Sequence, residues 1–224
     1  MCRGVESFTE DSAYFWAKTT PDGQPGISVR DHSLNVGCVG EALRDALPPA
    51  LKKLLPPGAV TLVALHDVGK ISPGFLVKCP LWLPQSNLGA VAAKENWAND
   101  QSNHALVSQW TLQQLFRSSK LHGWSAVVGA HHGRLSERTL GLLKVVPLAG
   151  GFWEQARRRL VSELELAFGP LPENPPESEA VLWFVAGLIT VADWIGSDED
   201  RFSPKGGESQ QARANASTAL RKLV

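Results

Sequence analysis

The sequence predicts an all-α protein, a helical bundle whose helices are joined by long irregular loops. Three observations support this prediction. Apolar residues recur at three- and four-residue steps in several separate segments, which is the pattern of a helix with one buried face. No segment shows the strict apolar–polar alternation of a half-buried strand. Proline and glycine are concentrated between the periodic segments, where they end helices and form turns.

The composition is that of a globular protein with a substantial core. The chain has 224 residues, of which 43% are hydrophobic and 20% are charged. Its 22 Lys and Arg balance its 22 Asp and Glu, so the formal net charge is zero. A free-standing nucleic-acid-binding protein is usually basic, which counts against that class. Two classes remain compatible with this balance: an enzyme whose bound cations supply local positive charge, and one that receives its substrate from a partner module.

The three cysteines, Cys2, Cys38 and Cys79, show no Cys-x-x-Cys spacing. Their small and odd number argues against a disulfide framework and against a thiolate zinc site, so we expect a reducing cytoplasm. The N-terminus lacks the apolar stretch of a secretory signal. The longest apolar run, residues 180–195, is interrupted by Asp193 among others, and it predicts a buried helix and not a membrane span.

The first thirty residues are rich in turns, and only residues 14–18 are apolar enough to pack. A helical stripe then runs from 32 to 47 and stops at two consecutive prolines. The next helix is predicted at about 59–68. It is apolar on nearly all sides, and Gly69 is its expected C-terminal cap.

Residues 72–103 are predicted to form a long irregular loop, because they contain several prolines and glycines. Loops of this length in compact domains are often functional, and this one leads to His104. Helices are predicted beyond it at about 105–118, 124–130, 151–168 and 177–196, followed by a polar stretch to residue 210 and a modest terminal helix.

Titratable residues stand at the ends of several of these apolar helices. His66 and Asp67 end one of them, and two adjacent titratable groups in such a place are costly unless they are paired or bind a metal. His131 and His132 end another, where a helix-to-loop transition lets both rings converge on one ion. Asp193 lies within the most apolar helix, where a buried carboxylate needs a cation.

Seven histidine and aspartate side chains are therefore expected on or beside apolar helices. At such positions they are unlike titratable residues that simply face solvent. Imidazole and carboxylate without thiolate suit Mn, Fe, Co, Ni or Zn, and are too rich in nitrogen for a site built around Mg or Ca. Seven ligands exceed what one ion needs, so two divalent transition-metal ions that share one bridging carboxylate fit better. The candidate ligands are His32, His66, Asp67, His104, His131, His132 and Asp193.

Four motifs carry a resemblance to a known family. The most specific is His-Asp-Val-Gly-Lys-Ile-Ser-Pro-Gly-Phe at 66–75, and the next is Ala-Asp-Trp-Ile-Gly-Ser-Asp at 192–198. Phe-Trp-Ala-Lys at 15–18 and His-His-Gly at 131–133 complete the set. Together they resemble the HD nuclease domain of the type I CRISPR nuclease–helicase, within the HD superfamily of metal-dependent phosphohydrolases. The resemblance runs over residues 15–202.

The resemblance implies an HD-domain helical bundle over residues 1–202. At 203–224 it implies a polar linker and a short helix that lead toward a helicase or the chain end. It also implies two adjacent metal sites bridged by Asp67. One ion is expected to bind His32, His66, Asp67 and Asp193, and the other Asp67, His104, His131 and His132.

Two residues near these ligands are expected to act on the substrate. Lys70 would face the scissile phosphate, although a lysine there also suits the C-terminal end of a helix. Ser197 either binds substrate or caps its loop. The expected catalytic residues are Asp67 and Lys70, and Asp31 is either a partner that orients His32 or a solvated residue at a helix start.

Most of the eight tryptophans are expected in the core. Trp82 and Trp97 lie in the long loop and are the candidates for base stacking. His122 is expected to be structural or at the surface, and the basic run 157–159 to be a solvated helix face.

By resemblance, the expected function is that of a metal-dependent deoxyribonuclease, which hydrolyses single-stranded DNA in type I CRISPR interference. The expected partners are single-stranded DNA, a helicase module, fused or separate, and the RNA-guided effector complex. The chain has no Gly-rich phosphate-binding loop with Gly-Lys-Ser/Thr, so we do not expect it to hydrolyse ATP. We therefore expect a stand-alone nuclease subunit or the N-terminal domain of a longer protein.

Two other functions stay open. The first is an HD phosphohydrolase that acts on a nucleotide or another small phosphate ester, against which the motifs at 15–18 and 192–198 argue. The second is a catalytically inactive subunit that only docks onto the effector complex or its helicase. The presence of all seven ligand residues favours an enzyme.

Overall fold

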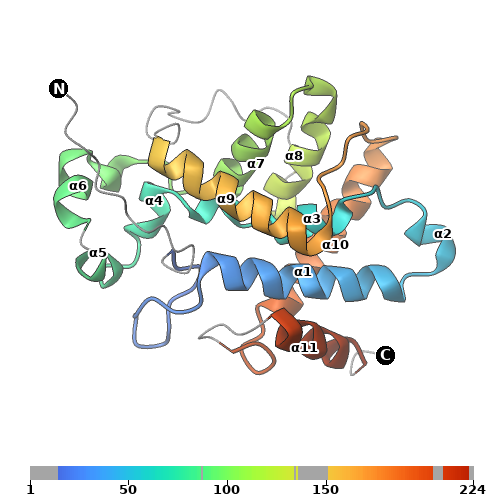
Figure 1. Cartoon of the computed structure of the whole chain (residues 1–224), viewed down its shortest axis with the longest axis horizontal. Coiled ribbons are helices and arrows are strands. Elements are labelled where there is room, and N and C mark those ends of the chain that lie inside the picture. The colour runs from blue at the N-terminus through green and yellow to red at the C-terminus, as the bar shows by residue number, and fades with distance from the viewer. Residues whose placement is uncertain (1–14, 87, 134, 136–150, 204–208, 222–224) are drawn as a thin grey trace.

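A computed structural model describes residues 15–86, 88–133, 135, 151–203 and 209–221 (Figure 1). Within these residues every regular element is a helix, and only isolated bridges join extended segments. The prediction of an all-α bundle with long loops is confirmed. The elements are α1 (Val29–Ala46), α2 (Pro49–Lys52), α3 (Ala59–Ala64), the 3-10 helix η2 (Val68–Lys70), α4 (Pro73–Leu76), α5 (Trp82–Gln85), α6 (Gly89–Lys94), η3 (Trp97–Asn99), α7 (His104–Leu115), η4 (Ser119–Leu121), α8 (His122–Gly129), η5 (Ala130–His132), α9 (Gly151–Phe168), α10 (Glu179–Gly196) and α11 (Ser209–Arg221).

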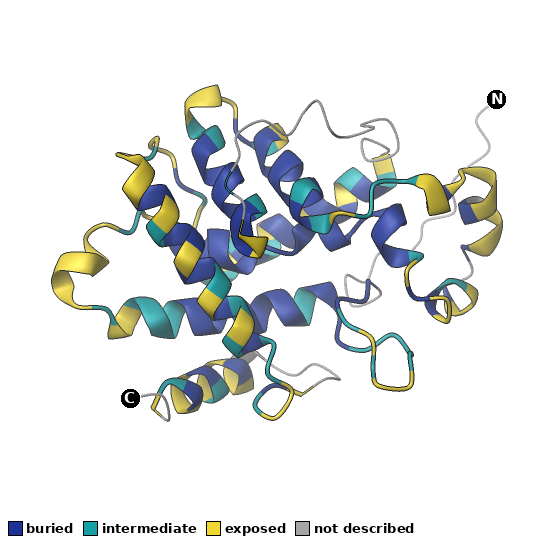
Figure 2. Ribbon diagram, turned by 180° about the vertical axis from the view of Figure 1, so that it is seen from behind, coloured by how far each residue is buried: buried dark blue, intermediate teal, exposed yellow. Residues whose placement is uncertain are grey.

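Helix α1 is the long blue helix that crosses the middle of Figure 1. It begins at Val29 because the Ser28 hydroxyl accepts a hydrogen bond from the Asp31 backbone amide, which caps the N-terminus. It ends at Ala46 because two prolines follow. Helices α3 and α10 pack against it, and α11 packs on its other side. In Figure 2 the buried residues gather where the helices meet, and exposed residues line the outer faces.

The second predicted helix is shorter than expected. Helix α3 ends at Ala64, and the chain turns before it forms η2. The prediction of a longer helix is wrong. Successive side chains of a regular helix point about 100° apart, whereas the turn after α3 brings the side chains of His66 and Asp67 to one site. Gly69 consequently lies inside η2 and does not cap α3. Its backbone amide donates a hydrogen bond of 2.8 Å to Ser108 Oγ on α7.

Helix α10 forms from the longest apolar run, as predicted, and Ser178 caps its N-terminus by accepting from the Val181 amide. One face packs against α1, α3 and α8. The opposite face exposes Trp183, Val191 and Trp194, so the expectation of a buried helix holds for one face only. By length and composition alone, α10 is apolar enough to cross a membrane, but its buried face belongs to the core.

Residues 15–28 form a loop that lies against the start of α1. Its first residues, Phe15, Trp16 and Ala17, are buried. The Ala17 amide donates to the Ile27 carbonyl at 2.8 Å, which holds the two arms of the loop together. The expected packing of this stretch is confirmed from Phe15 onward.

Helix α9 supports the segment that follows η2. Arg157 is only 1% exposed and donates from Nη1 to the Ile71 carbonyl at 2.8 Å. A buried carbonyl at a chain turn requires a donor, and this guanidinium supplies it. The expectation of a solvated face at 157–159 is therefore wrong for Arg157, while Arg158 and Arg159 are exposed.

Candidate metal centre

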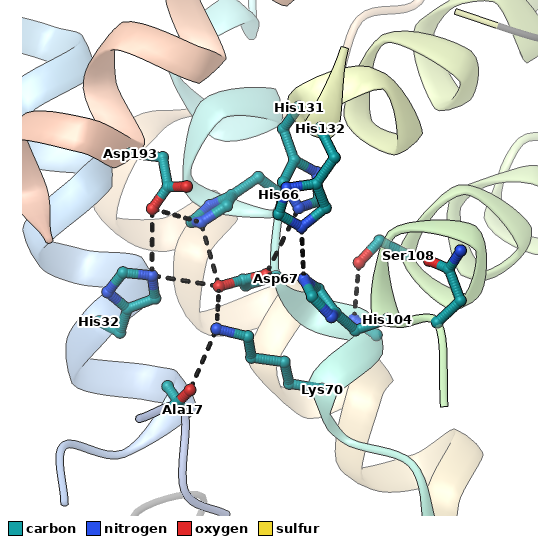
Figure 3. A network of polar contacts seen from close by, with 12 residues as sticks. Ala17, His32, His66, Asp67, Lys70, His104, Ser108, His131, His132 and Asp193 are labelled. Atoms are coloured by element: carbon teal, nitrogen blue, oxygen red, sulfur yellow. Dashed lines mark hydrogen bonds and ion pairs between the residues drawn. The ribbon is translucent and has the colours of Figure 1, made fainter. Parts of the chain in front are cut away.

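The ends of five elements meet at one point and bring the seven candidate ligands together (Figure 3). His32 comes from the first turns of α1, and His66 and Asp67 come from the turn between α3 and η2. The N-terminus of α7, η5 and the last turn of α10 supply the others. The ligands contributed by these three elements are His104, His131, His132 and Asp193.

Asp67 lies in the middle of this group, and its two oxygens face different partners. Asp67 Oδ2 is 3.1 Å from His32 Nε2 and 3.2 Å from His66 Nε2. Asp67 Oδ1 is 3.2 Å from His104 Nε2 and 3.7 Å from His131 Nε2. The carboxylate therefore joins two adjacent ligand clusters.

The first half-site is completed by Asp193. Its Oδ1 is 3.5 Å from His32 Nε2 and 3.4 Å from His66 Nε2. We define the first half-site as His32, His66, Asp193 and Asp67 Oδ2.

The second half-site is built from three imidazoles. His132 Nε2 is 3.0 Å from His104 Nε2, and ligand atoms of both lie within 4.8 Å of one on His131. We define the second half-site as His104, His131, His132 and Asp67 Oδ1.

Backbone carbonyls orient two of the buried rings. The Nδ1 of His66 contacts the Val63 carbonyl at 3.1 Å, and that of His131 contacts the Val128 carbonyl at 2.7 Å. Because a carbonyl only accepts, each Nδ1 must carry the proton in the neutral ring. Each Nε2 then presents its lone pair to the centre of the site, as metal-binding histidines do.

The donor set fits divalent metal ions. His32 Nε2, His66 Nε2, His131 Nε2 and Asp67 Oδ1 are buried and have no hydrogen bond of acceptable geometry among the described residues. Leaving four such atoms unsatisfied is costly, and a cation in each half-site would satisfy them all. Nitrogen and carboxylate oxygen without sulfur suit the first-row transition metals.

A family profile described as "Cas3, HD domain" matches residues 16–202. The chain belongs to the Cas3 HD-domain family. Among curated proteins, the CRISPR-associated endonuclease/helicase Cas3 of Thermus thermophilus is 28% identical to it over 244 residues. The similarity covers 97% of this chain and 26% of that protein, so the chain spans about a quarter of the relative's length.

Solved structures agree with this assignment. The crystal structure of the Thermus thermophilus Cas3 HD domain in the presence of Ni²⁺ matches with a TM-score of 0.64 and 25% identity, over 96% of this chain and 91% of that one. The crystal structure of T. fusca Cas3–AMPPNP shares the fold, with a TM-score of 0.66 and 22% identity over 94% of this chain and 26% of that one. The resemblance carried by the four motifs is confirmed, and the chain contains a Cas3-type HD domain.

The protonation states of the Cas3 HD-domain histidines differ between the half-sites. Burial lowers the pKa of His104 to about 3 and that of His131 to about 4, so both rings are neutral near pH 7 and ready to bind metal. Burial also acts to lower the pKa of His66. The Asp67 and Asp193 carboxylates outweigh it and raise that pKa to about 10. Metal binding at His66 must therefore release a proton.

The stability of the metal-free domain is expected to fall as the pH drops from about 6.5 toward about 4. The pKa values of His104 and His131 lie below that of an unfolded histidine, so the unfolded chain takes up protons first in this window. The contribution of these neutral rings is complete above about pH 6.5. The contribution of His66 has the opposite sign. It is constant below about pH 6.5 and is lost as the pH rises toward about 10.

Thermal melts in EDTA across this pH window check the expectation. In the His104→Gln variant, the melting temperature should change less steeply with pH than in the parent. A melting temperature that stays constant from about pH 6.5 to about pH 4.5 would contradict it.

Lys70 contacts the bridging carboxylate in this structure. Its Nζ is 2.6 Å from Asp67 Oδ2 and donates to the Ala17 carbonyl at 3.1 Å (Figure 3). Burial acts to raise the pKa of Asp67, but Lys70 and then His66 hold it well below its usual range. Lys70 therefore keeps Asp67 ionised, and its contact with a scissile phosphate stays a prediction.

Three other residues have definite places. Ser197 is the C-cap of α10, and its hydroxyl donates to Asp193 Oδ1 at 2.9 Å. Among the described residues, Asp31 pairs with Arg30 at 3.2 Å and not with a histidine ring, which favours its role at the helix start. His122 lies at the opposite end of α8 from the metal centre.

The tryptophans are distributed differently from the expectation. Trp82 and Trp97 are each 2% exposed, so base stacking on them is excluded and that prediction is wrong. Trp194 directly follows Asp193 and is 71% exposed. Because Asp193 points toward the ligands, the next residue of the helix points about 100° away from it. The position of Trp194 directly after a predicted ligand on a helix was therefore the sequence signal that could have identified it as an exposed aromatic residue.

Proposed function

We propose that this domain is a metal-dependent nuclease that hydrolyses the backbone of single-stranded DNA in CRISPR interference. The observation that carries the proposal is the position of Asp67, whose two oxygens face the two half-sites. A carboxylate shared in this way suits a pair of divalent ions, an arrangement common in enzymes that cleave phosphodiesters. The nitrogen-rich ligands favour two transition-metal ions, drawn from Mn, Fe, Co, Ni and Zn.

The residues of the chain prepare this site for phosphodiester hydrolysis. When bound, two such ions supply Lewis acidity toward a phosphate and a water that ionises near neutral pH. Asp67 would bind both ions, and Lys70 keeps its carboxylate ionised. The Ser197 hydroxyl holds the Asp193 carboxylate against the first half-site.

One exposed aromatic residue on α10 favours a single strand as the substrate. Trp194 exposes most of its indole next to Asp193. An exposed aromatic ring offers a stacking surface to an unpaired base, whereas the bases of a duplex are already stacked on one another. The exposed Trp194 ring supports DNA with accessible bases over a small phosphate ester.

The proposed partners are a helicase module, fused or separate, and the RNA-guided effector complex. The Thermus thermophilus relative is an endonuclease/helicase, and this chain covers only its nuclease-like quarter. A helicase that grips the DNA backbone also accounts for the neutral charge of this domain. The proposed setting is the cytoplasm, which the two free buried cysteines suit.

The decisive experiment measures the metal content of the purified protein and then its cleavage of circular single-stranded DNA. We expect about two transition-metal ions per chain. We also expect the circle to be opened, EDTA to abolish that cleavage, and one or more of Mn, Co, Ni or Mg to restore it.

Other outcomes point to the alternatives. If the fully metallated protein leaves the circle intact but releases phosphate from nucleotides, the domain is a small-ester phosphohydrolase. If it retains metal and turns over neither substrate, it is a docking subunit.

A further inference from the structure

Three lysines surround the metal centre, although the chain carries no net charge. Lys70 lies inside it and is occupied by Asp67 and Ala17. Lys18 and Lys78 lie outside the ligands, one beside each half-site. Neither has an ion-pair partner among the described residues. Two lysines beside a phosphate-binding site that donate to backbone carbonyls and form no ion pair with a carboxylate indicate an anionic ligand that extends beyond the metals.

Lys18 lies beside the first half-site. Its Nζ donates to the Ser197 carbonyl at 2.9 Å, and the Ser197 hydroxyl in turn donates to Asp193. Lys18, His32 and Ser197 line the same narrow crevice. Burial lowers the pKa of Lys18, the Asp193 carboxylate opposes that shift, and the charge of Lys70 adds to it. Lys18 is thus within electrostatic range of both residues.

Lys78 lies beside the second half-site. Its Nζ donates to the Ser102 carbonyl at 2.9 Å and is 5.1 Å from the centre of the Phe75 ring. The same ring packs edge-on against His104, with 5.3 Å between the ring centres. Burial lowers the pKa of Lys78, and the charge of Lys70 lowers it further. Lys78 is exposed, so a ligand in the site can reach it.

This arrangement suits a polymer better than a single phosphate group. A monophosphate needs one cluster of cations, which metals around Asp67 already supply. We propose that Lys18 and Lys78 bind the backbone phosphates on either side of the scissile one, so that the strand crosses the metal centre from one half-site to the other. The inference rests on the proposed nuclease function and assigns recognition of a polynucleotide to the same site. In this arrangement Lys70 pairs with the Asp67 carboxylate and does not contact the DNA backbone.

The salt dependence of DNA binding tests this assignment. The probe is a fluorescein-labelled 20-nucleotide phosphorothioate strand, which is cut slowly, bound to the metal-loaded protein at about 50 to 200 mM NaCl. Each lysine that neutralises a phosphate adds about 0.7 to the slope of log K against log salt. We expect Lys18→Gln and Lys78→Gln each to reduce the slope by about 0.7, and the double variant by about 1.4. The arginine variants should restore it.

Lys52 provides a matched control. Its Nζ also donates to a backbone carbonyl, that of Asp45 at 3.1 Å, but it lies in α2 at the far end of α1 from His32. We expect Lys52→Gln to leave the slope unchanged. Lys78 is exposed and its variant will fold, so it carries the test if Lys18→Gln lowers the stability of the domain.

Steady-state cleavage of an unmodified 20-nucleotide strand gives the second readout. We expect each glutamine variant to raise KM about fivefold to tenfold and to change kcat little. Folded variants that keep the parent slope and KM overturn the assignment. If the parent binds DNA with the expected lysine dependence but does not cut it, the phosphate contacts stand and the nuclease function fails.

Discussion

Asp67→Asn is expected to abolish DNA cleavage, with a loss of about a thousandfold or more, and to release both metal ions. The carboxylate contributes one oxygen to each half-site, at 3.1 and 3.2 Å from His32 and His104. Asparagine offers a single carbonyl oxygen, and its amide group would direct hydrogens toward the other half-site. Metal content by mass spectrometry and cleavage of circular single-stranded DNA measure the two effects.

The same substitution removes the partner of a buried ammonium. Lys70 Nζ is 2.6 Å from Asp67 Oδ2, and breaking a buried pair of this kind costs about 3–5 kcal/mol. Adding Lys70→Gln should recover much of this stability without restoring cleavage or metal. An Asp67→Asn protein that retains two ions and cuts at the parent rate would falsify the bridging role.

Gly69→Ala is expected to have the second largest effect, a loss of about 3 kcal/mol in stability together with one of the two metal ions. A Cβ at Gly69 would lie 2.1 Å from the His104 carbonyl and 2.4 Å from the Ser108 amide nitrogen. Both atoms belong to the backbone of α7, so the whole helix must move. His104 moves with it and the second half-site opens, while the first half-site has no ligand on α7.

Thermal melting and metal analysis check this result. A loss of about 3 kcal/mol corresponds to a drop of about 6–12 °C for a domain of this size. Gly187→Ala is the matched control, because Gly187 is an exposed helical position with nothing within 4 Å of an added Cβ. It should raise stability by up to about 1 kcal/mol. If Gly69→Ala keeps the parent melting temperature and both ions, the close approach of η2 and α7 is not required for stability or for metal binding.

Periodicity predicted the long helices α1, α7, α9 and α10 well because each has an apolar face that the core buries. It missed the short helix α2 and the short helices α4, α5 and α6 within the stretch predicted to be irregular, 72–103. The break after Ala64 was not predictable in this way, since 59–65 is apolar except for Thr61 and favours a helix that continues into His66. There the geometry of the ligands His66 and Asp67 decides the backbone. The motifs, in contrast, contain five of the seven residues that the structure brings together, His66, Asp67, His131, His132 and Asp193. His32 and His104 stand outside the motifs and were predicted from their places beside apolar helices.

Residues outside the motifs were harder to interpret because their environment depends on tertiary contacts. Arg157 belongs to a run that looks solvated, and only the packing of α9 beside Ile71 shows that it is buried. Trp97 stands in a polar loop, yet its ring packs against Trp153 at 5.2 Å between centres. Sequence patterns describe the neighbours along the chain, whereas these side chains are placed by neighbours that are distant in sequence.

The ligands span the chain from His32 to Asp193 and come from elements that lie far apart in the sequence. An ion bound at either half-site would therefore act as a reversible cross-link that closes long stretches of chain, and its binding free energy would become folding free energy. In the proposed nuclease, metal supply would then govern how far the domain resists opening and proteolysis as well as how fast it acts, and copies without metal would be the first to be degraded.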